Sequence, residues 1–584
     1  MSDIIMIQAH HLTKQFPARP SSPAVTALSS LNLTIKKGTL TALIGPDGAG
    51  KTTFMRLVCG LLQSDSGSLS VCGYDVQQSP QAVQDRIGYM PQKFGLYEDL
   101  SVMENLTLYA DIHSIPPDLR QKHFRELLDL TGLSPFTARP AGKLSGGMKQ
   151  KLGLACTLVS TPDLLLLDEP TVGVDPLSRR ELWHILHTLS EEKSLTVLVN
   201  TSYIEEAEQC QYAYILHKGQ LLADGTPESL LQYARGRCYD VRVPQGMPPR
   251  FIQSWLLDDR HVVMDAVPEG SQVRFTVSSR QLPNHLLLQN YLPGAVITPV
   301  SPRLEDSFMI LLRKAGSTEE EIPGMPSLPK VPPAISGDTI IEAHDIVRRF
   351  GSFVAVDHTS FSVHKGEIFG LLGPNGAGKS TTFRMLCGLL SASSGTISVY
   401  GVNLRTARAR ARSYIGYVAQ KFSLYSTLSV YENLCFFGRA YGLAAHKLQE
   451  RIETVAGQFH LNNCLSMAAG SLPGGYKQRL SMAAALLHDP PILFLDEPTS
   501  GIDPLARRTF WRQITGLAAR GTTIVVTTHF MEEAEYCDRI MIQDRGRLIA
   551  IGTPSAIRHQ GGDSPTMNEA FIHIVETGRQ KEDS

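Results

Sequence analysis

The feature that most constrains the fold of this chain is an internal repeat. The segment GPDGAGKTT begins at Gly45, and a near copy, GPNGAGKST, begins at Gly373, an offset of 328 residues. The same offset joins YMPQKFGLYEDLSVMENL to YVAQKFSLYSTLSVYENL, and LLLLDEPTVGVDP to ILFLDEPTSGIDP. Chance matches would not keep one register across three separate segments, so the sequence predicts two copies of one domain in tandem.

Composition excludes several other classes of protein. Hydrophobic residues make up 42% of the 584 residues and charged residues 19%, which is typical of globular domains with large cores. The 55 basic and 56 acidic residues nearly cancel, whereas a nucleic-acid binder should carry a basic surplus, so no nucleic-acid partner is expected. No apolar run approaches the roughly 18 to 20 residues of a membrane helix.

The termini and the cysteines predict a location inside the cell. The first ten residues, MSDIIMIQAH, lack the basic flank of a signal peptide. The nine cysteines are scattered without metal-binding spacing, which favours reduced thiols in the cytoplasm.

The segment between the two copies has a different character. It starts with strand-like alternation in CYDVRV, continues with a predicted hairpin that turns at Glu269 and Gly270, and ends in a predicted helix, RLEDSFMILL. A similar TMNEAFIHIV closes the second copy, whose own accessory region is shorter. The expected organisation is a first domain over 1–236, an accessory α+β segment over 237–313, a proline-rich linker over 314–337, a second domain over 338–560 and a C-terminal helical tail over 561–584. The accessory segment could regulate, dimerise or brace the first domain.

Each glycine-rich segment has the pattern of a phosphate-binding loop. LTALI and IFGLL, which precede the loops, read as buried strands, and a helical pattern follows each loop. The glycines let backbone N–H groups curl around phosphates at the positive end of a helix, while a lysine reaches the β and γ phosphates and a hydroxyl holds Mg²⁺. The predicted ATP-binding residues are Gly45, Gly48, Gly50, Lys51, Thr52 and Thr53 in the first copy, and Gly373, Gly376, Gly378, Lys379, Ser380 and Thr381 in the second.

Two adjacent acids follow a further buried strand in each copy. Asp168 and Asp496 are predicted to bind Mg²⁺ together with Thr52 and Ser380. Glu169 and Glu497 come one residue later, where a carboxylate can polarise the attacking water. The sequence therefore predicts an α/β ATPase with two sites that use ATP and Mg²⁺.

The segment LSGGMKQK, from Leu144 to Lys151, resembles the signature motif of ABC ATPases, and the resemblance covers nearly the whole chain. It implies two P-loop, RecA-like ABC nucleotide-binding domains, each with a helical subdomain. It also implies that Gln92 and Gln420 sense Mg²⁺ and face membrane subunits, that Asp175 and Asp503 form D-loops, and that His529 contacts the γ-phosphate. Further nucleotide contacts implied by the resemblance are the aromatic residues Phe16 and Phe350 and the signature residues Ser145, Gly146, Gly147, Gly474 and Gly475; Phe16 and Phe350 could instead be core aromatics.

The resemblance also implies that two domains close head to tail, so that each ATP lies between one phosphate loop and the other domain's signature. Three departures from the family pattern, Asp47, Ser202 and Pro473, then fall in one composite site. Serine lacks the imidazole of His529, and proline offers neither the N–H nor the hydroxyl of a signature serine. We therefore expect a consensus hydrolytic site at the second phosphate loop and a degenerate one at the first, within a single chain; drift without mechanistic meaning is the alternative.

Within the ABC ATPases the chain is most similar to the ABC-2 drug-exporter branch. This resemblance implies two separate integral-membrane permease subunits per ATPase chain, a peripheral location on the cytoplasmic face of the inner membrane, and efflux of drugs or similar small molecules. Phe94, Tyr97, Phe422 and Tyr425 are candidate apolar contacts to the permease. A ribosome-associated ABC-F translation factor is an alternative, but its linker should be basic and helical. A tandem sugar-importer ATPase is another, but it typically lacks the lysine that is present here as Lys379.

Overall fold

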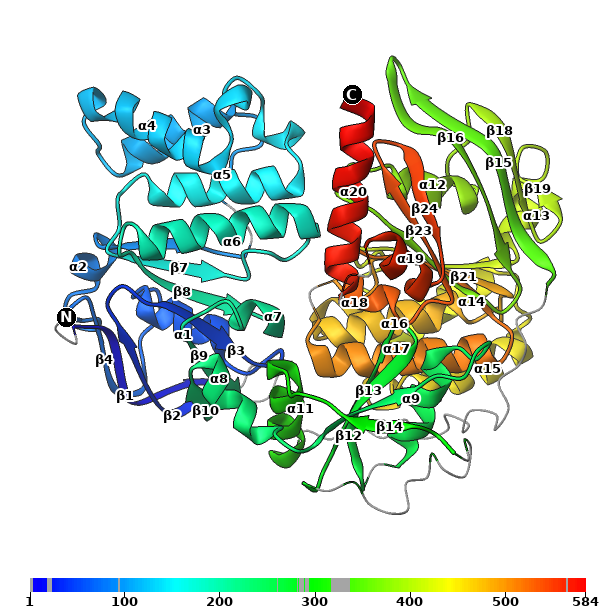
Figure 1. The fold of residues 1–584 in the computed structure, drawn as a ribbon, viewed down its shortest axis with the longest axis horizontal. Helices are drawn as coiled ribbons and strands as arrows, with labels where there is room; N and C mark the ends of the chain where they lie inside the picture. The colour runs from blue at the N-terminus through cyan, green and yellow to red at the C-terminus, as the bar shows by residue number, and fades with distance from the viewer. Residues whose placement is uncertain are drawn as a thin grey trace. The chain divides into compact units, whose positions relative to one another are not determined.

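The computed structural model describes residues 4–583 except 18–23, 93–94, 260, 281, 283–287, 289–291, 293, 317–336, 501, 563 and 565. The chain divides into two compact units (Figure 1). Unit 1 comprises Met1–Arg235, Pro302–Ser317 and Asp503–Leu505, and unit 2 comprises Gly236–Ser301, Thr318–Ile502 and Ala506–Ser584. We call residues 1–235 the first repeat, residues 338–584 the second repeat, and Gly236–Ser301 the accessory lobe.

A six-stranded sheet forms the centre of the first repeat, in the order β10-β9-β3-β8-β7-β6. Its strands are β3 (Leu40–Ile44), β6 (Ile87–Met90), β7 (Leu164–Asp168), β8 (Thr196–Thr201), β9 (Tyr212–His217) and β10 (Gln220–Gly225). All are parallel except β10. Every residue of β3, β7 and β8 is buried, as expected for parallel strands covered on both faces.

The remaining elements of the first repeat form an antiparallel sheet and the helices. The sheet has the order β2-β1-β4-β5 and consists of β1 (Ile5–Phe16), β2 (Val25–Lys36), β4 (Ser66–Val71) and β5 (Tyr74–Asp75). The helices are α1 (Lys51–Val58), α2 (Pro80–Gln84), α3 (Val102–Ile112), α4 (Pro117–Thr131), α5 (Gly146–Leu158), α6 (Pro176–Glu191), α7 (Ile204–Ala207) and α8 (Pro227–Leu230), with 3-10 turns η1 (Ser134–Phe136), η2 (Ala141–Lys143) and η3 (Leu231–Tyr233). Helices α3, α4 and α5 pack together as a helical subdomain.

The second repeat has the same architecture. Its sheets have the orders β20-β21-β22-β17-β23-β24 and β16-β15-β18-β19. The strands are β15 (Thr339–Phe350), β16 (Phe353–His364), β17 (Ile368–Leu372), β18 (Ser394–Val399), β19 (Val402–Asn403), β20 (Ile415–Val418), β21 (Ile492–Asp496), β22 (Thr523–Thr527), β23 (Arg539–Asp544) and β24 (Arg547–Gly552). The helices are α12 (Lys379–Leu386), α13 (Arg408–Arg412), α14 (Val430–Ala440), α15 (Ala445–Gln458), α16 (Gly474–Ala485), α17 (Pro504–Ala519), α18 (Met531–Ala534), α19 (Pro554–Gln560) and α20 (Met567–Asp583), with η4 (Asn462–Cys464) and η5 (Ala469–Ser471).

Among its described residues, the accessory lobe contains a four-stranded antiparallel sheet and the helix α9 (Pro249–Asp258). The sheet has the order β12-β13-β11-β14, from β11 (Cys238–Arg242), β12 (Val263–Glu269), β13 (Gln272–Val277) and β14 (Ile297–Pro299). Helix α9 (Pro249–Asp258) packs on β12 and β13, and Phe251, Trp255 and Phe275 contribute to a separate hydrophobic core. The predicted hairpin is confirmed, with its turn at Gly270 and Ser271.

The structure divides the expected accessory segment between the units. The lobe belongs to unit 2 with the second repeat, whereas the predicted helix, α11 (Leu304–Lys314), belongs to unit 1 and packs on α7 and η3. Its apolar face explains this, because Leu304, Phe308 and Leu312 join the core of the first repeat. Helix α20 has the corresponding place in the second repeat, against α18 and α19. Most of the predicted linker, residues 317–336, lies outside the described residues.

No helix within the described part of the chain combines the length and apolar character needed to span a membrane.

Candidate nucleotide-binding sites

The first phosphate loop runs from β3 into α1. Gly50 caps α1 with φ 101°, a left-handed conformation, and a Cβ there would lie 2.3 Å from the Ala27 carbonyl oxygen, so only glycine fits. Lys51 is buried and its Nζ donates to the carbonyl oxygens of Gly45 at 2.6 Å and Pro46 at 3.1 Å. Thr52 and Thr53 follow in the first turn of α1, where N–H groups and the helix dipole favour an anion.

The second phosphate loop has the same geometry. Gly378 caps α12 with φ 100°. The Nζ of Lys379 donates to the carbonyl oxygens of Gly373 at 2.6 Å and Pro374 at 2.9 Å. Ser380 and Thr381 lie in the first turn of α12. The glycine caps and lysine contacts of the two loops are therefore equivalent, although Asp47 of the first loop replaces Asn375 of the second.

The expected magnesium positions lie at the ends of β7 and β21. In the first repeat, the Thr52 hydroxyl donates to Asp168 Oδ1 at 3.2 Å, the Tyr89 hydroxyl donates to Oδ2 at 3.3 Å, and the Asn200 amide also donates to Oδ1. A hydroxyl beside a carboxylate suits Mg²⁺, which takes oxygen ligands. Sequence reasoning did not identify Tyr89 or Asn200, because no local spacing links them to Asp168.

In the second repeat, Thr527 takes the place of Asn200 and its hydroxyl donates to Asp496 Oδ1 at 2.7 Å. Burial raises the pKa of Asp496, while the Thr527 hydrogen bond opposes that shift. Gln92 and Gln420, the other predicted metal contacts, are both exposed. Within the described residues, no cluster of three or more His, Cys, Asp or Glu forms a separate metal site.

Glu169 is held by the residue that replaces histidine in the first repeat. Its Oε2 accepts hydrogen bonds from the Ser202 backbone N–H at 3.2 Å and from the Ser202 hydroxyl at 3.0 Å. Burial is the largest influence and raises the pKa of Glu169 to about 7, although Lys51 and the hydrogen bonds from Ser202 lower it. Part of the carboxyl is therefore protonated at neutral pH, and only the ionised part can accept a proton from water.

Glu497 has different neighbours in the second repeat. Its Oε2 accepts a hydrogen bond from Gln420 Nε2 at 2.6 Å and lies 3.2 Å from His529 Nδ1. Burial alone would raise the pKa of Glu497, but the hydrogen bond and charge of His529, with Lys379 and Gln420, outweigh it and leave the pKa below its ordinary value. The structure thus brings together three residues that the sequence predicted for one site, and keeps the glutamate ionised.

The two signature segments differ at the start of their helices. Ser145 caps α5, and its hydroxyl accepts a hydrogen bond from the Met148 N–H at 3.3 Å. Gly146 begins that helix, and Gly147 packs so closely that a Cβ would lie 2.4 Å from the Ser178 side chain. Pro473 occupies the same place before α16 and provides no side-chain cap to Gly474 and Gly475.

The expected adenine-stacking aromatics lie at the ends of β1 and β15. Phe350 is 47% exposed and the Arg348 guanidinium lies 4.5 Å from its ring centroid, so it is not a core residue. Phe16 is half-buried, with Lys14 Nζ 5.8 Å from its ring centroid. Their contact with adenine stays a prediction.

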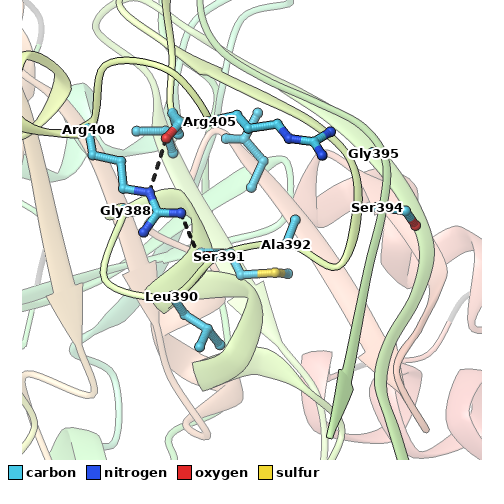
Figure 2. Close-up of a pocket in the computed structure, with 11 residues that line it drawn as sticks. Gly388, Leu390, Ser391, Ala392, Ser394, Gly395, Arg405 and Arg408 are labelled. Carbon is cyan, nitrogen blue, oxygen red and sulfur yellow. Dashed lines mark hydrogen bonds between the residues drawn. The ribbon is translucent and has the colours of Figure 1, made fainter.

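A hollow in the second repeat is distinct from the phosphate loop. It lies between α12, β18 and the start of α13, and holds about 40 Å³, room for a water but not for a nucleotide (Figure 2). Arg408 closes one side by donating to the Leu404 carbonyl oxygen at 3.2 Å and to the Ser391 hydroxyl at 2.5 Å (Figure 2). These two bonds attach Arg408 to the loop before β18 and to the residue after β19, and the hollow is too small for a nucleotide.

Two phosphate loops, an Asp-Glu pair at the end of β7 and another at the end of β21, and a capped signature helix define an ATPase of the ABC class. The sequence model of the family described as ABC transporter matches residues 28–172 and 356–500. The chain is 48% identical over 579 residues to the probable multidrug ABC transporter ATP-binding protein YbhF of Escherichia coli (strain K12), covering 98% of each chain. It therefore belongs to the ABC transporter ATP-binding proteins and is an ABC-type ATPase coupled to transmembrane transport.

Two further relatives match this chain over about the length of one repeat. Nod factor export ATP-binding protein I of Burkholderia lata is 44% identical over 218 residues, 37% of this chain and 72% of that protein. Linearmycin resistance ATP-binding protein LnrL of Bacillus subtilis (strain 168) is 42% identical over 244 residues, 40% of this chain and 78% of that protein. The match thus includes both repeats in the E. coli relative, but only about one repeat's length in these two.

Proposed function

We propose that this chain is the ATP-hydrolysing subunit of an ABC-2 type exporter that moves drugs or similar small molecules. The relative that matches over 98% of its length is named as a probable multidrug transporter component, and the two shorter relatives carry the names of an export system and of a resistance protein. ATP binding would close the two repeats head to tail, and hydrolysis would reopen them. The driving energy is the differential affinity of the closed state for nucleotide.

The second phosphate loop marks the site of faster hydrolysis in this proposal. The observation that carries it is the contact of Glu497 with both Gln420 and His529, against the contact of Glu169 with Ser202. Gln420 and His529 give Glu497 two side-chain partners that would orient it toward the attacking water and keep it ionised, whereas Ser202 offers Glu169 no imidazole. Glu169 remains in place, so the first site would hold ATP longer and turn it over slowly.

The oxygen-bearing side chains at both sites are of the kind that binds Mg²⁺. Thr52 with Asp168, and Ser380 with Asp496, would hold it through oxygen ligands, with Gln92 and Gln420 at the edge of each site. When bound, the ion would neutralise the charge of the β and γ phosphates. Lys51 and Lys379 would exchange their bonds to loop carbonyl oxygens for bonds to phosphate oxygens.

The helical subdomains would receive the two permease subunits at the cytoplasmic face of the membrane. In the second repeat, Tyr425 is 49% exposed and packs edge-on against Phe436, which is 46% exposed, while Phe422 is half-buried. In the first repeat, Tyr97 is 58% exposed and Phe94 lies outside the described residues. Exposed aromatic side chains in a group suit a protein interface.

The proposal is tested by purifying the tagged full-length chain from detergent-solubilised membranes and identifying the chains that come with it. Two polytopic membrane proteins in roughly equal amounts would support the exporter and identify the permease for substrate screening. Ribosomal subunits in their place would contradict it and would favour a translation factor of the ABC-F type.

A further inference from the structure

The accessory lobe contacts the second repeat through charged side chains that are almost fully buried. Arg250, at the start of α9, forms an ion pair with Asp538, and the two side chains are only 3% and 4% exposed. Asp538 Oδ2 also accepts a hydrogen bond at 2.8 Å from the N–H of Ile368, the first residue of β17. Strand β17 leads directly into the second phosphate loop.

The lobe's hairpin reaches two helices beside the catalytic residues. Asp265, on β12, lies 3.4 Å from Nε of Arg508, and Nη1 of Arg508 donates to the Tyr536 hydroxyl at 3.2 Å. At the hairpin turn, the Gly270 N–H donates to Glu535 Oε2 at 2.6 Å. Arg508 belongs to α17, whereas Glu535 and Tyr536 directly follow α18. The lobe therefore holds both helices at once.

From these helices a short chain of contacts reaches the catalytic glutamate. The Arg507 guanidinium lies 4.6 Å from the ring centroid of Phe530, and its Nε lies 3.8 Å from the buried Glu533. Phe530 immediately follows His529, whose Nδ1 lies 3.2 Å from Glu497. A shift of α17 relative to α18 would consequently move the imidazole relative to the glutamate.

Among the described residues of the first repeat, the positions that align with Arg508 and Asp538 have different surroundings. Arg180 aligns with Arg508 but is exposed, whereas Arg508 is 1% exposed. Gln211 aligns with Asp538, and its Oε1 accepts from the Leu40 N–H at 3.1 Å, the same role that Asp538 has at β17. An amide is thus sufficient to cap this strand. The negative charge in the second repeat is explained by the arginine of the accessory lobe.

We propose that the accessory lobe is a positioning element for hydrolysis in the second repeat. Through Arg250 and Asp265 it holds α17 and α18 in the arrangement that keeps His529 against Glu497. The lobe is inserted after the first repeat in sequence, yet it serves the second, which has no accessory sheet after its own core among the described residues. The inference rests on the proposed function in one respect, namely that Glu497 and His529 carry the hydrolysis.

The test is the steady-state ATPase activity of the full-length chain with Asp538→Gln and, separately, Arg508→Met. Glutamine already fills the aligned position in the first repeat, so Asp538→Gln keeps the strand cap and removes the negative charge that pairs with the buried Arg250. Because an unpaired buried charge destabilises a fold, the unfolding midpoint of each variant is measured beside its activity. We expect kcat to fall about ten- to a hundredfold, as for a small misplacement of catalytic groups. KM for ATP and the affinity for a fluorescent ATP analogue should stay within about twofold, because the phosphate loop is untouched.

Arg180→Met is the matched control and should leave kcat within about twofold, whereas Arg508→Lys should retain more activity than Arg508→Met because it keeps the charge beside Asp265. An unchanged kcat in Asp538→Gln, or an equal loss of nucleotide affinity, would overturn the positioning role. Glu497→Gln separates the two proposals. If that variant keeps wild-type activity, the assignment of the hydrolytic site fails; if it loses activity while Asp538→Gln does not, only the role of the lobe fails.

Discussion

The two repeats have phosphate loops of the same geometry, but different side chains surround the candidate catalytic glutamate in each. Lys51 and Lys379 each donate to a loop carbonyl oxygen at 2.6 Å. By contrast, Glu169 is hydrogen-bonded to Ser202, and Glu497 lies between Gln420 and His529. The geometry of the phosphate loop is therefore the same in both copies, while the residues around the glutamate have diverged. The difference is the basis of our proposal that the two halves of the chain hydrolyse ATP at unequal rates.

The largest expected change in ATPase rate comes from exchanging His529 and Ser202, the residues beside the two glutamates. His529→Ser removes the imidazole from Glu497, and we expect ATPase activity to fall about a hundredfold, because the glutamate loses the partner that orients it and keeps it ionised. The reciprocal change, Ser202→His, should leave the rate unchanged or raise it a few-fold, because Glu169 gains a partner that favours its ionised form. Both are measured as phosphate release at saturating ATP. Equal losses of ATPase rate in the two variants would contradict the proposed difference between the two sites.

A smaller difference is expected in how the ATPase rate of each site depends on pH, when the glutamate of the other site has been replaced. In Glu497→Gln only the first site keeps its base, and burial raises the pKa of Glu169 to about 7. A base must be ionised to act, so the residual rate should rise several-fold as pH increases from about 6 to 8. In Glu169→Gln the remaining base is Glu497, whose pKa is lowered, and the rate should be nearly flat over the same range. Superimposable profiles would contradict the assigned environments.

The smallest effect concerns the signature helices. Ser145 caps α5, so Ser145→Ala should lower the free energy of unfolding by about 1 kcal/mol in urea titration. Pro473→Ala is the matched change before α16, where no side-chain cap exists, and should lower it by less. A larger loss in Pro473→Ala would show that the proline stabilises its helix in a way the capping argument omits.

The parts of the molecule that were predictable from sequence are those in which contacts are local. The strands before each phosphate loop, the LLLLD and ILFLD strands, the accessory hairpin and the helix at RLEDSFMILL all depend on short patterns, and the structure contains them. The proximity of His529 to Glu497 was implied only by family resemblance, since 32 residues separate them.

Contacts between distant segments were not predictable in the same way. Asp538 and Arg250 are 288 residues apart, and nothing in either local sequence indicates that they pair in the core of one unit. From the sequence alone, the accessory segment was therefore predicted to be a single α+β segment of unknown role. In the structure, its sheet and its last helix belong to different units. A cue was present in the repeat itself, because Asp538 is acidic where its counterpart Gln211 is neutral.

The most direct test of unequal sites compares the ATPase rates of Glu497→Gln and Glu169→Gln in the full-length chain, with ATP binding measured in parallel. The asymmetry predicts that Glu497→Gln loses about a hundredfold or more in kcat, whereas Glu169→Gln loses no more than about threefold, and that both variants still bind ATP. Equal losses in the two variants, with binding intact, would contradict the claim that hydrolysis belongs mainly to the second phosphate loop.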